Sequence, residues 1–243
     1  MMSPPRDREV RRVVQVLVAV ALAFLAGQLV AVLFQGIGVA LAHPALGTAV
    51  LTLPSPPWWT TALGLVGLWV GFAGGTFLAY RNEIVDAWPT AWRLRASDSI
   101  YLLLGIALQG LVAVIYAPFH LAHLSQPVHK IFDGSRGVTF LLLALMTAVG
   151  APMVEEWLFR GVLFRGLAGS SPSRRRFWVA AVTSAVLFGL AHGEWIQLPG
   201  LVLLGLVLAV VVTRTGRLVP SMMTHVGFNG IALVALVAQR AHS

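Results

Sequence analysis

The sequence of 243 residues contains no cysteine and a single lysine, Lys130. Without cysteine the chain has no disulfide bonds, no thiolate metal ligands and no cysteine nucleophile. Charged residues are also scarce, at 11% of the chain, whereas about a quarter of the residues of a soluble domain are charged. This composition excludes an ordinary soluble globular protein.

Hydrophobic residues make up 58% of the sequence, and the mean hydropathy is +0.82. They are gathered in long apolar runs, and a helix needs about 20 such residues to cross a bilayer. We therefore expect an all-α fold, a polytopic membrane helix bundle of about seven transmembrane helices. The predicted spans are residues 13–42, 58–80, 99–117, 138–168, 177–192, 198–214 and 220–240.

The formal net charge is +8, which in a soluble chain would indicate nucleic-acid binding. Here, however, the arginines alternate with the apolar spans, and arginine-rich loops are retained in the cytoplasm. Most basic residues lie in the N-terminal tail and in segments 81–98, 165–176 and 214–217. We therefore expect the lipid bilayer and no nucleic acid as a partner, with a cytoplasmic N-terminus and an external C-terminus.

The segments between the spans differ in composition. Residues 81–98 combine arginines with tryptophans, which predicts an interfacial segment on the cytoplasmic side. Residues 170–176 carry three consecutive arginines and are predicted to form a cytoplasmic turn. The predicted external loop 118–137 contains His120 and His123, which could bind a metal, although no third ligand lies at a defined spacing from them. The glycines of the second span predict close helix packing rather than a site.

Two acids and a base interrupt the fourth predicted span: Glu155, Glu156 and Arg160. A charge at bilayer depth costs several kcal/mol, so ionisable residues there face the bundle interior and mark a site. Glu156 and Arg160 are i,i+4 neighbours that can pair, while Glu155 points about 100° away and remains for other partners.

We divide the single integral membrane unit into residues 1–137, which supply helices and loops, and residues 138–243, which contain the site.

Polar residues on two later spans could join this stretch. His192 ends the fifth span, and His225 and Asn229 are i,i+4 neighbours on the seventh, so their side chains face the same way. Each feature alone has a structural explanation, because buried polar groups need partners and an intramembrane His or Asn can simply join helices. Their concentration in one region indicates a functional site.

These residues carry a resemblance to a known family. Three motifs occur in order on successive apolar segments: Glu155-Glu156-x-x-x-Arg160, Phe188-x-x-x-His192 and His225-x-x-x-Asn229. Over residues 138–237 the chain resembles the CAAX protease and bacteriocin-processing (CPBP, or Abi) family, which includes the type II CAAX prenyl endopeptidases. The resemblance implies an intramembrane endopeptidase.

The family also implies roles for the individual residues. Glu155 together with His192 would activate a water molecule for attack on a peptide bond. Glu156, restrained by Arg160, would orient the site. General acid–base chemistry by a positioned carboxylate is consistent with this assignment.

The resemblance further implies that His225 and Asn229 stabilise the oxyanion of the tetrahedral intermediate. The motifs do not decide whether a metal cofactor takes part. A divalent metal such as zinc could be held by Glu155, His192 and His225, a donor set that catalytic zinc accepts. Metal-free activation of water by a glutamate fits the spacing of the motifs slightly better.

The implied substrate is a membrane-associated protein or peptide, of which a prenylated CAAX-like protein is one kind, and the implied location is a bacterial plasma membrane. Oligomeric state is not indicated. The alternatives are a non-catalytic membrane scaffold, a bacteriocin-immunity protein, or a proton-coupled transporter that uses Glu155 and His192 as a relay. Transporters often contain inverted repeats, and none is evident here. An enzyme would lose its function on Glu155→Gln, whereas a scaffold would not.

Overall fold

The computed structural model describes residues 5–42, 45, 47–53, 56–86, 88, 90–119, 126–169 and 171–241, which form helices and connecting segments with no strand among them. The long helices are α1 (Pro5–Ala42), α2 (Trp58–Arg81), α3 (Ile100–Tyr116), α8 (Arg174–Ala191), α9 (Leu198–Thr215) and α10 (Val219–Ala241). A continuous helical run consists of α5 (Gly137–Leu145), η4 (Met146–Gly150), α6 (Ala151–Glu156), η5 (Trp157–Phe164) and α7 (Arg165–Ala168). Short helices are η1 (Gly47–Thr52), η2 (Ala96–Ser99), η3 (Ala117–Phe119) and α4 (Gln126–Phe132).

The predicted membrane helix bundle is confirmed. Within the described residues, six helices are long and apolar enough to cross a membrane, compared with the seven or so expected. The difference lies in α8, the predicted fifth span, whose 18 residues begin with three arginines. The candidate spans are Glu9–Ala42, Trp58–Arg81, Ala96–Phe119, Gly137–Ala168, Leu198–Thr215 and Val219–Ala238. The chain is an integral membrane protein.

Two predicted boundaries are corrected. Helix α1 begins at Pro5, well before the apolar run, and α8 begins at Arg174, inside the predicted turn. The hydroxyl of Ser173 caps α8 by accepting a hydrogen bond from the backbone N–H of Arg176 (3.3 Å). Arg176 then pairs with Glu9 (2.7 Å), which connects the polar first turns of the two helices.

The predicted external loop contains a helix, α4, rather than extended chain alone. Its last residue, Phe132, is 1% exposed and packs with Leu143 of α5 and Leu236 of α10 in a small second core. Burial of this aromatic side chain explains the local helix, because packing outweighs the weak propensity of a short segment. His120 and His123, the suggested metal ligands of this loop, lie outside the described residues.

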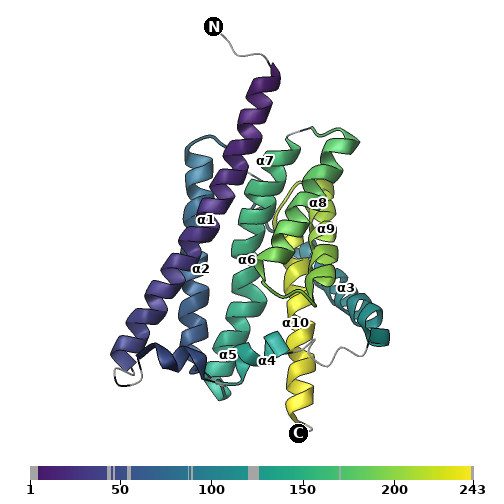
Figure 1. The fold of residues 1–243 in the computed structure, drawn as a ribbon. Coiled ribbons are helices and arrows are strands. Elements are labelled where there is room, and N and C mark those ends of the chain that lie inside the picture. Colours follow the sequence, from purple (N-terminus) through teal and green to yellow (C-terminus); the bar gives the residue numbers. More distant parts are fainter. Residues whose placement is uncertain are drawn as a thin grey trace.

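Helices α1 and α2 pack backbone against backbone. A side chain at Gly67 would collide with the backbone of Ala31, and one at Gly71 would collide with the backbone of Gly27. Lipid offers no hydrophobic drive for helix association, so van der Waals contact between closely approaching backbones supplies the attraction. The predicted packing role is confirmed for Gly67, Gly71 and Gly75 of α2 but not for Gly74, and α1 crosses α2 obliquely (Figure 1).

The segment between α2 and α3 folds against the turn between α9 and α10. The backbone N–H of Leu218 donates to the carbonyl of Ala91 (2.8 Å). Arg217 donates two hydrogen bonds to the carboxylate of Asp98, at 2.6 and 2.7 Å. These hydrogen bonds raise the pKa of Arg217 above its ordinary value, so its guanidinium stays charged.

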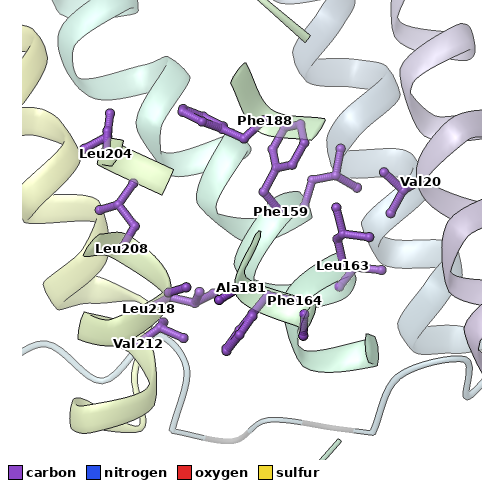
Figure 2. Packing of buried hydrophobic residues seen from close by; sticks show 14 of the residues in the cluster. Val20, Phe159, Leu163, Phe164, Ala181, Phe188, Leu204, Leu208, Val212 and Leu218 are labelled. Atoms are coloured by element: carbon purple, nitrogen blue, oxygen red, sulfur yellow. The ribbon is translucent and has the colours of Figure 1, made fainter. Parts of the chain in front are cut away.

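The main hydrophobic core surrounds η5. Phe159, Leu163 and Phe164 are buried among side chains of α1, α8 and α9 (Figure 2). The ring of Phe159 lies 6.2 Å from that of Phe72 on α2 and 5.4 Å from that of Phe188 on α8. The segment that follows the two glutamates is therefore the central element of the bundle.

Candidate functional site

The glutamates lie between two π-helical segments. In η4 the backbone N–H of Ala151 donates to the carbonyl of Met146, and in η5 the N–H of Arg165 donates to the carbonyl of Arg160, each five residues back. Pro152 lacks an N–H and so cannot complete the usual α-helical bond in this turn. The helical run thus changes its hydrogen-bond register next to Pro152. π-Helical segments of this kind are frequent at functional sites.

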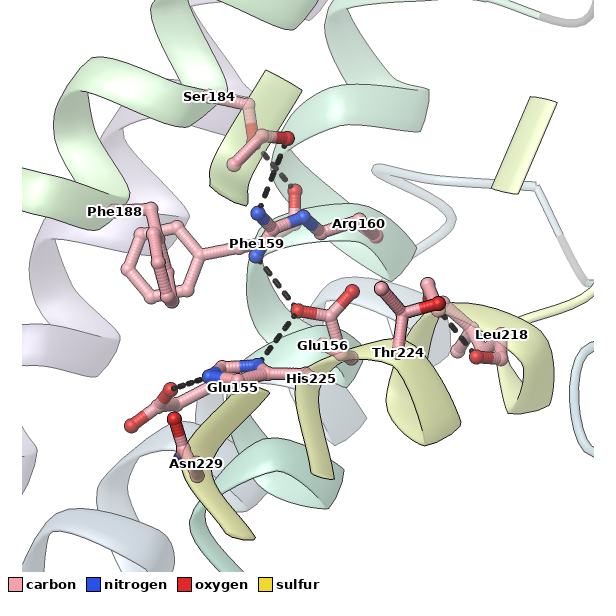
Figure 3. Close-up of polar contacts among 12 residues, drawn as sticks. Glu155, Glu156, Phe159, Arg160, Ser184, Phe188, Leu218, Thr224, His225 and Asn229 are labelled. Atoms are coloured by element: carbon pink, nitrogen blue, oxygen red, sulfur yellow. Dashed lines mark hydrogen bonds and ion pairs between the residues drawn. The ribbon is translucent and has the colours of Figure 1, made fainter. Parts of the chain in front are cut away.

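Four of the predicted site residues form a continuous row. Arg160 Nη1 donates to Glu156 Oε1 at 2.8 Å, which confirms the predicted i,i+4 pair. The same Glu156 oxygen lies 3.3 Å from His225 Nδ1. On the other side of the imidazole, His225 Nε2 lies 3.8 Å from Glu155 Oε2 (Figure 3). Acidic and basic groups alternate along this row, so each carboxylate has a basic neighbour.

The two glutamates differ in accessibility. The side chain of Glu156 is 0% exposed, whereas that of Glu155 is 18% exposed. Arg160 is itself held on two further sides: Nη2 donates to the carbonyl of Gly205 on α9 at 3.3 Å, and its guanidinium carbon lies 4.5 Å from the ring centre of Phe188. One carboxylate is therefore fixed inside the bundle, and the other can be reached by a bound molecule.

Asn229 lies beside this row, as its spacing to His225 predicts. Its Nδ2 donates to the carbonyl of Thr147 in η4 at 3.1 Å, which links α10 to the first π-helical segment. A side-chain amide has two N–H donors, so one remains for another acceptor.

His192 is placed apart from the row. It is exposed at the C-terminal end of α8, and its Nδ1 lies 2.8 Å from the carbonyl of Phe188. Its ring lies 4.8 Å from the ring of Phe188, which in turn lies 5.4 Å from the ring of His225. The structure brings Glu155, Glu156, Arg160 and His225 into one row, and both His192 and His225 pack against the ring of Phe188.

Three residues that contact η5 were missed by sequence reasoning. They are Ser184 on α8, Tyr80 on α2 and Gly205 on α9. Only Ser184 has a sequence signal, because it precedes Phe188 by four residues and His192 by eight, and so shares their helix face. Nothing in the local sequence distinguishes Tyr80 or Gly205 from other residues of their helices.

The suggested metal ligands do not assemble. In the part of the chain that the structure describes, no three His, Asp or Glu side chains are grouped in a way that could hold a metal ion. Glu155 and His225 are neighbours, whereas the ring contact of His192 is with Phe188. Catalytic zinc needs three protein ligands around one point, and this arrangement does not supply them.

The fold and the site define the class of the protein: an all-helical membrane protein with a row of paired acids and bases inside its spanning helices. Residues 137–231, from α5 into α10, match the family described as type II CAAX prenyl endopeptidase Rce1-like. The match contains all six predicted site residues and confirms the resemblance carried by the three motifs. At the level of the family, this match supports a membrane CAAX-type protease.

Two curated relatives are also similar to the chain. One is an uncharacterized 24.3 kDa protein of Escherichia coli, 27% identical over 65% of this chain and 73% of its own length. The other is YdiL of Bacillus subtilis (strain 168), whose name describes it as a candidate membrane peptidase; it is 25% identical over 52% of this chain and 50% of its own length. This chain thus aligns with only half of YdiL. No solved structure matches the chain significantly.

Proposed function

We propose that the protein is an intramembrane endopeptidase that hydrolyses a peptide bond of a membrane-associated protein or peptide. The observation that carries this proposal is the row Glu155–His225–Glu156–Arg160, in which only one carboxylate is accessible. A row of charges that served only to join helices would not need an accessible member. The family-level match over the same residues supports a hydrolase.

Glu155 is the general base in this mechanism. Its carboxylate takes a proton from a water molecule, the oxygen attacks the carbonyl carbon of the substrate, and the same proton passes to the amine that leaves when the C–N bond breaks. His225 Nε2, at 3.8 Å in the free protein, closes on Glu155 when substrate is bound, since catalytic hydrogen bonds are often long before binding. Glu156, which is itself held by Arg160, lies against the other imidazole nitrogen and so fixes the ring.

The geometry assigns the remaining residues different tasks. Both nitrogens of His225 face carboxylates, so we assign it to the row rather than to the oxyanion. Asn229 has one N–H left to donate to the oxyanion. The hydrogen bond from His192 Nδ1 to the carbonyl of Phe188 leaves Nε2 as an acceptor, which suits a second proton carrier at the exposed end of α8.

A substrate must reach a carboxylate that lies within the spanning helices. Substrates are therefore membrane-associated, and a peptide with an attached prenyl group is one class that meets this requirement. We also infer that the arginine-rich end of the bundle faces the cytoplasm of a bacterial plasma membrane. The positive-inside rule and the bacterial sources of both relatives support this orientation and location.

The proposal is tested by incubating the purified protein in lipid with membrane-embedded peptides, with and without a prenyl group. Wild type is compared with Glu155→Gln and with Glu83→Gln, which neutralises an exposed acid outside the site. We expect Glu155→Gln to lower the cleavage rate roughly 100-fold or more, and Glu83→Gln to leave it unchanged. Cleavage that survives Glu155→Gln would refute the assignment. Repeating the assay with a chelator tests metal dependence independently.

A further inference from the structure

Three consecutive residues of η5 form hydrogen bonds to three different helices. The carbonyl of Phe159 accepts from Ser184 Oγ on α8 at 3.0 Å. Arg160 donates to the carbonyl of Gly205 on α9 at 3.3 Å. The carbonyl of Gly161 accepts from Tyr80 Oη on α2 at 3.1 Å. The segment is therefore held from three directions over a single turn.

A π-helical segment needs this kind of support. Such segments are rare, because bonds to the fifth residue back are less favourable than those of an α-helix. Hydroxyl donors bound to the carbonyls of Phe159 and Gly161 stabilise the unusual register. Gly161 contributes by its size, since a Cβ there would lie 3.3 Å from Tyr80 Oη and would crowd the hydroxyl.

The rotation of η5 determines where the glutamates point. Glu155 and Glu156 end α6, and the first residue of η5 follows directly. Arg160, which fixes Glu156, lies between the two carbonyls that the hydroxyls bind. A return of this turn to α-helical register would rotate Arg160 relative to Glu156 and would disturb the row that ends at Glu155.

We propose that Ser184 and Tyr80 are positioning residues, which hold η5 in its π-helical register and thereby aim Glu155. This inference rests on the proposed peptidase function. Ser184 is completely buried and lies one helical turn before Phe188, the residue whose ring contacts the Arg160 guanidinium. Helix α8 therefore contacts the backbone of η5 and the side chain of Arg160 from adjacent turns.

The test compares variants that remove one hydroxyl. Ser184→Ala and Tyr80→Phe delete the two donors to η5, and Ser184→Thr keeps a hydroxyl at the first position. Ser221→Ala is the matched control for serine, because Ser221 is also fully buried but donates to its own helix at the carbonyl of Leu218 (2.8 Å). Tyr116→Phe is the control for tyrosine, since Tyr116 donates from α3 to the carbonyl of Ile196 in the turn before α9, at 2.7 Å and away from η5.

Two measurements are made on each variant in lipid: amide hydrogen exchange of the peptide that covers residues 157–164, and the kinetics of cleavage. We expect Ser184→Ala and Tyr80→Phe to speed exchange in this peptide and to lower kcat roughly 10-fold to 100-fold, as small misplacements of catalytic groups do. KM should change less than about twofold, because substrate binding is not altered. Ser184→Thr should restore both values, and the two controls should leave them unchanged.

The outcomes separate the two proposals. Unchanged exchange in Ser184→Ala and Tyr80→Phe would overturn the role in holding η5, whatever the activity. Faster exchange with an unchanged kcat would overturn the role in aiming Glu155. If the wild type cleaves no peptide, the proposed function fails, while the exchange data still decide whether the hydroxyls hold η5. Tyr80→Phe adds no volume, so it keeps the test valid if a Ser184 variant does not fold.

Discussion

The α1–α2 pair and the helices around η5 achieve close packing in opposite ways. In α1–α2, glycines remove side chains so that two backbones touch. Around η5, large side chains fill the space, and a completely buried arginine pairs with a buried glutamate and packs against a phenylalanine ring. The first interface depends mainly on the fit of two backbones, and the second depends on a buried ion pair and its hydrogen bonds.

The difference shows which region of the protein can carry reactive side chains. An interface of glycines has no side chains that could react, and it remains intact if a neighbouring polar group changes. A buried polar network carries reactive groups but loses stability steeply when one member is removed. Four substitutions, taken from the largest expected effect to the smallest, test whether the two regions behave this differently.

Replacing Arg160 with methionine should have the largest effect. Glu156 is 0% exposed and would lose its guanidinium partner. Breaking a buried pair by removing one member costs about 3–5 kcal/mol. Thermal or denaturant unfolding in detergent measures this cost, and the double variant Arg160→Met with Glu156→Gln should recover most of it. Equal losses in the single and double variants would contradict the buried-charge explanation.

Asp98→Asn should have the next largest effect. Asp98 is 1% exposed and accepts two hydrogen bonds from Arg217, which joins the start of α3 to the turn before α10. Losing charge-assisted bonds of this kind costs about 1.5–3 kcal/mol. The expected result is a lower unfolding midpoint and faster proteolysis in the segment around residue 95. A midpoint equal to that of the wild type would show that the pair adds no stability.

Gly71→Ala probes the glycine interface directly. The added methyl group would collide with the backbone of Gly27, so α1 and α2 must separate locally, at a cost of about 1–3 kcal/mol. Gly74→Ala is the matched control in the same helix, because nothing lies within 4 Å of its added Cβ. Unfolding midpoints of the two variants should differ clearly. Similar midpoints would mean that helix propensity, rather than packing, determines the effect.

Arg12→Gln should have the smallest effect. Arg12 Nη2 lies 3.0 Å from Asp86 Oδ2, but the two side chains are 32% and 65% exposed. Exposed pairs contribute about 0–1 kcal/mol and are weakened by salt. The unfolding midpoint should therefore change little, and the small difference from wild type should vanish in high salt. A large drop in the unfolding midpoint would show that this pair stabilises the protein as strongly as the buried network does.

Local spacing predicted the parts of the site that belong to a single helix. The pair Glu156–Arg160 and the shared face of His225 and Asn229 follow from 3.6 residues per turn, because that geometry does not depend on neighbouring helices. The apolar spans were likewise recognisable from composition, since lipid exposure requires a continuous apolar stretch. These predictions needed no knowledge of the tertiary fold.

The remaining features depend on how the helices face one another. The contacts of Ser184 and Tyr80 with η5 join residues 25 and 81 positions apart in the sequence. The π-helical register leaves no side-chain pattern that separates it from an α-helix, because it differs only in which backbone groups are bonded. The contact of both His192 and His225 with a single ring, that of Phe188, joins two helices. Such features follow from packing between helices. They depend on the complete tertiary structure and leave no signal in any local stretch of sequence.

Helix α1 also has a consequence for the surrounding bilayer. Its 38 residues span about 57 Å, whereas the hydrocarbon layer is about 30 Å thick. Helix α3, with 17 residues, is only about 26 Å long. Helices of such unequal length cannot all match one membrane thickness, so α1 must tilt and adjust its tilt as the thickness changes. Because α1 is pressed against the backbone of α2, we expect a change in membrane thickness to act on these two helices together.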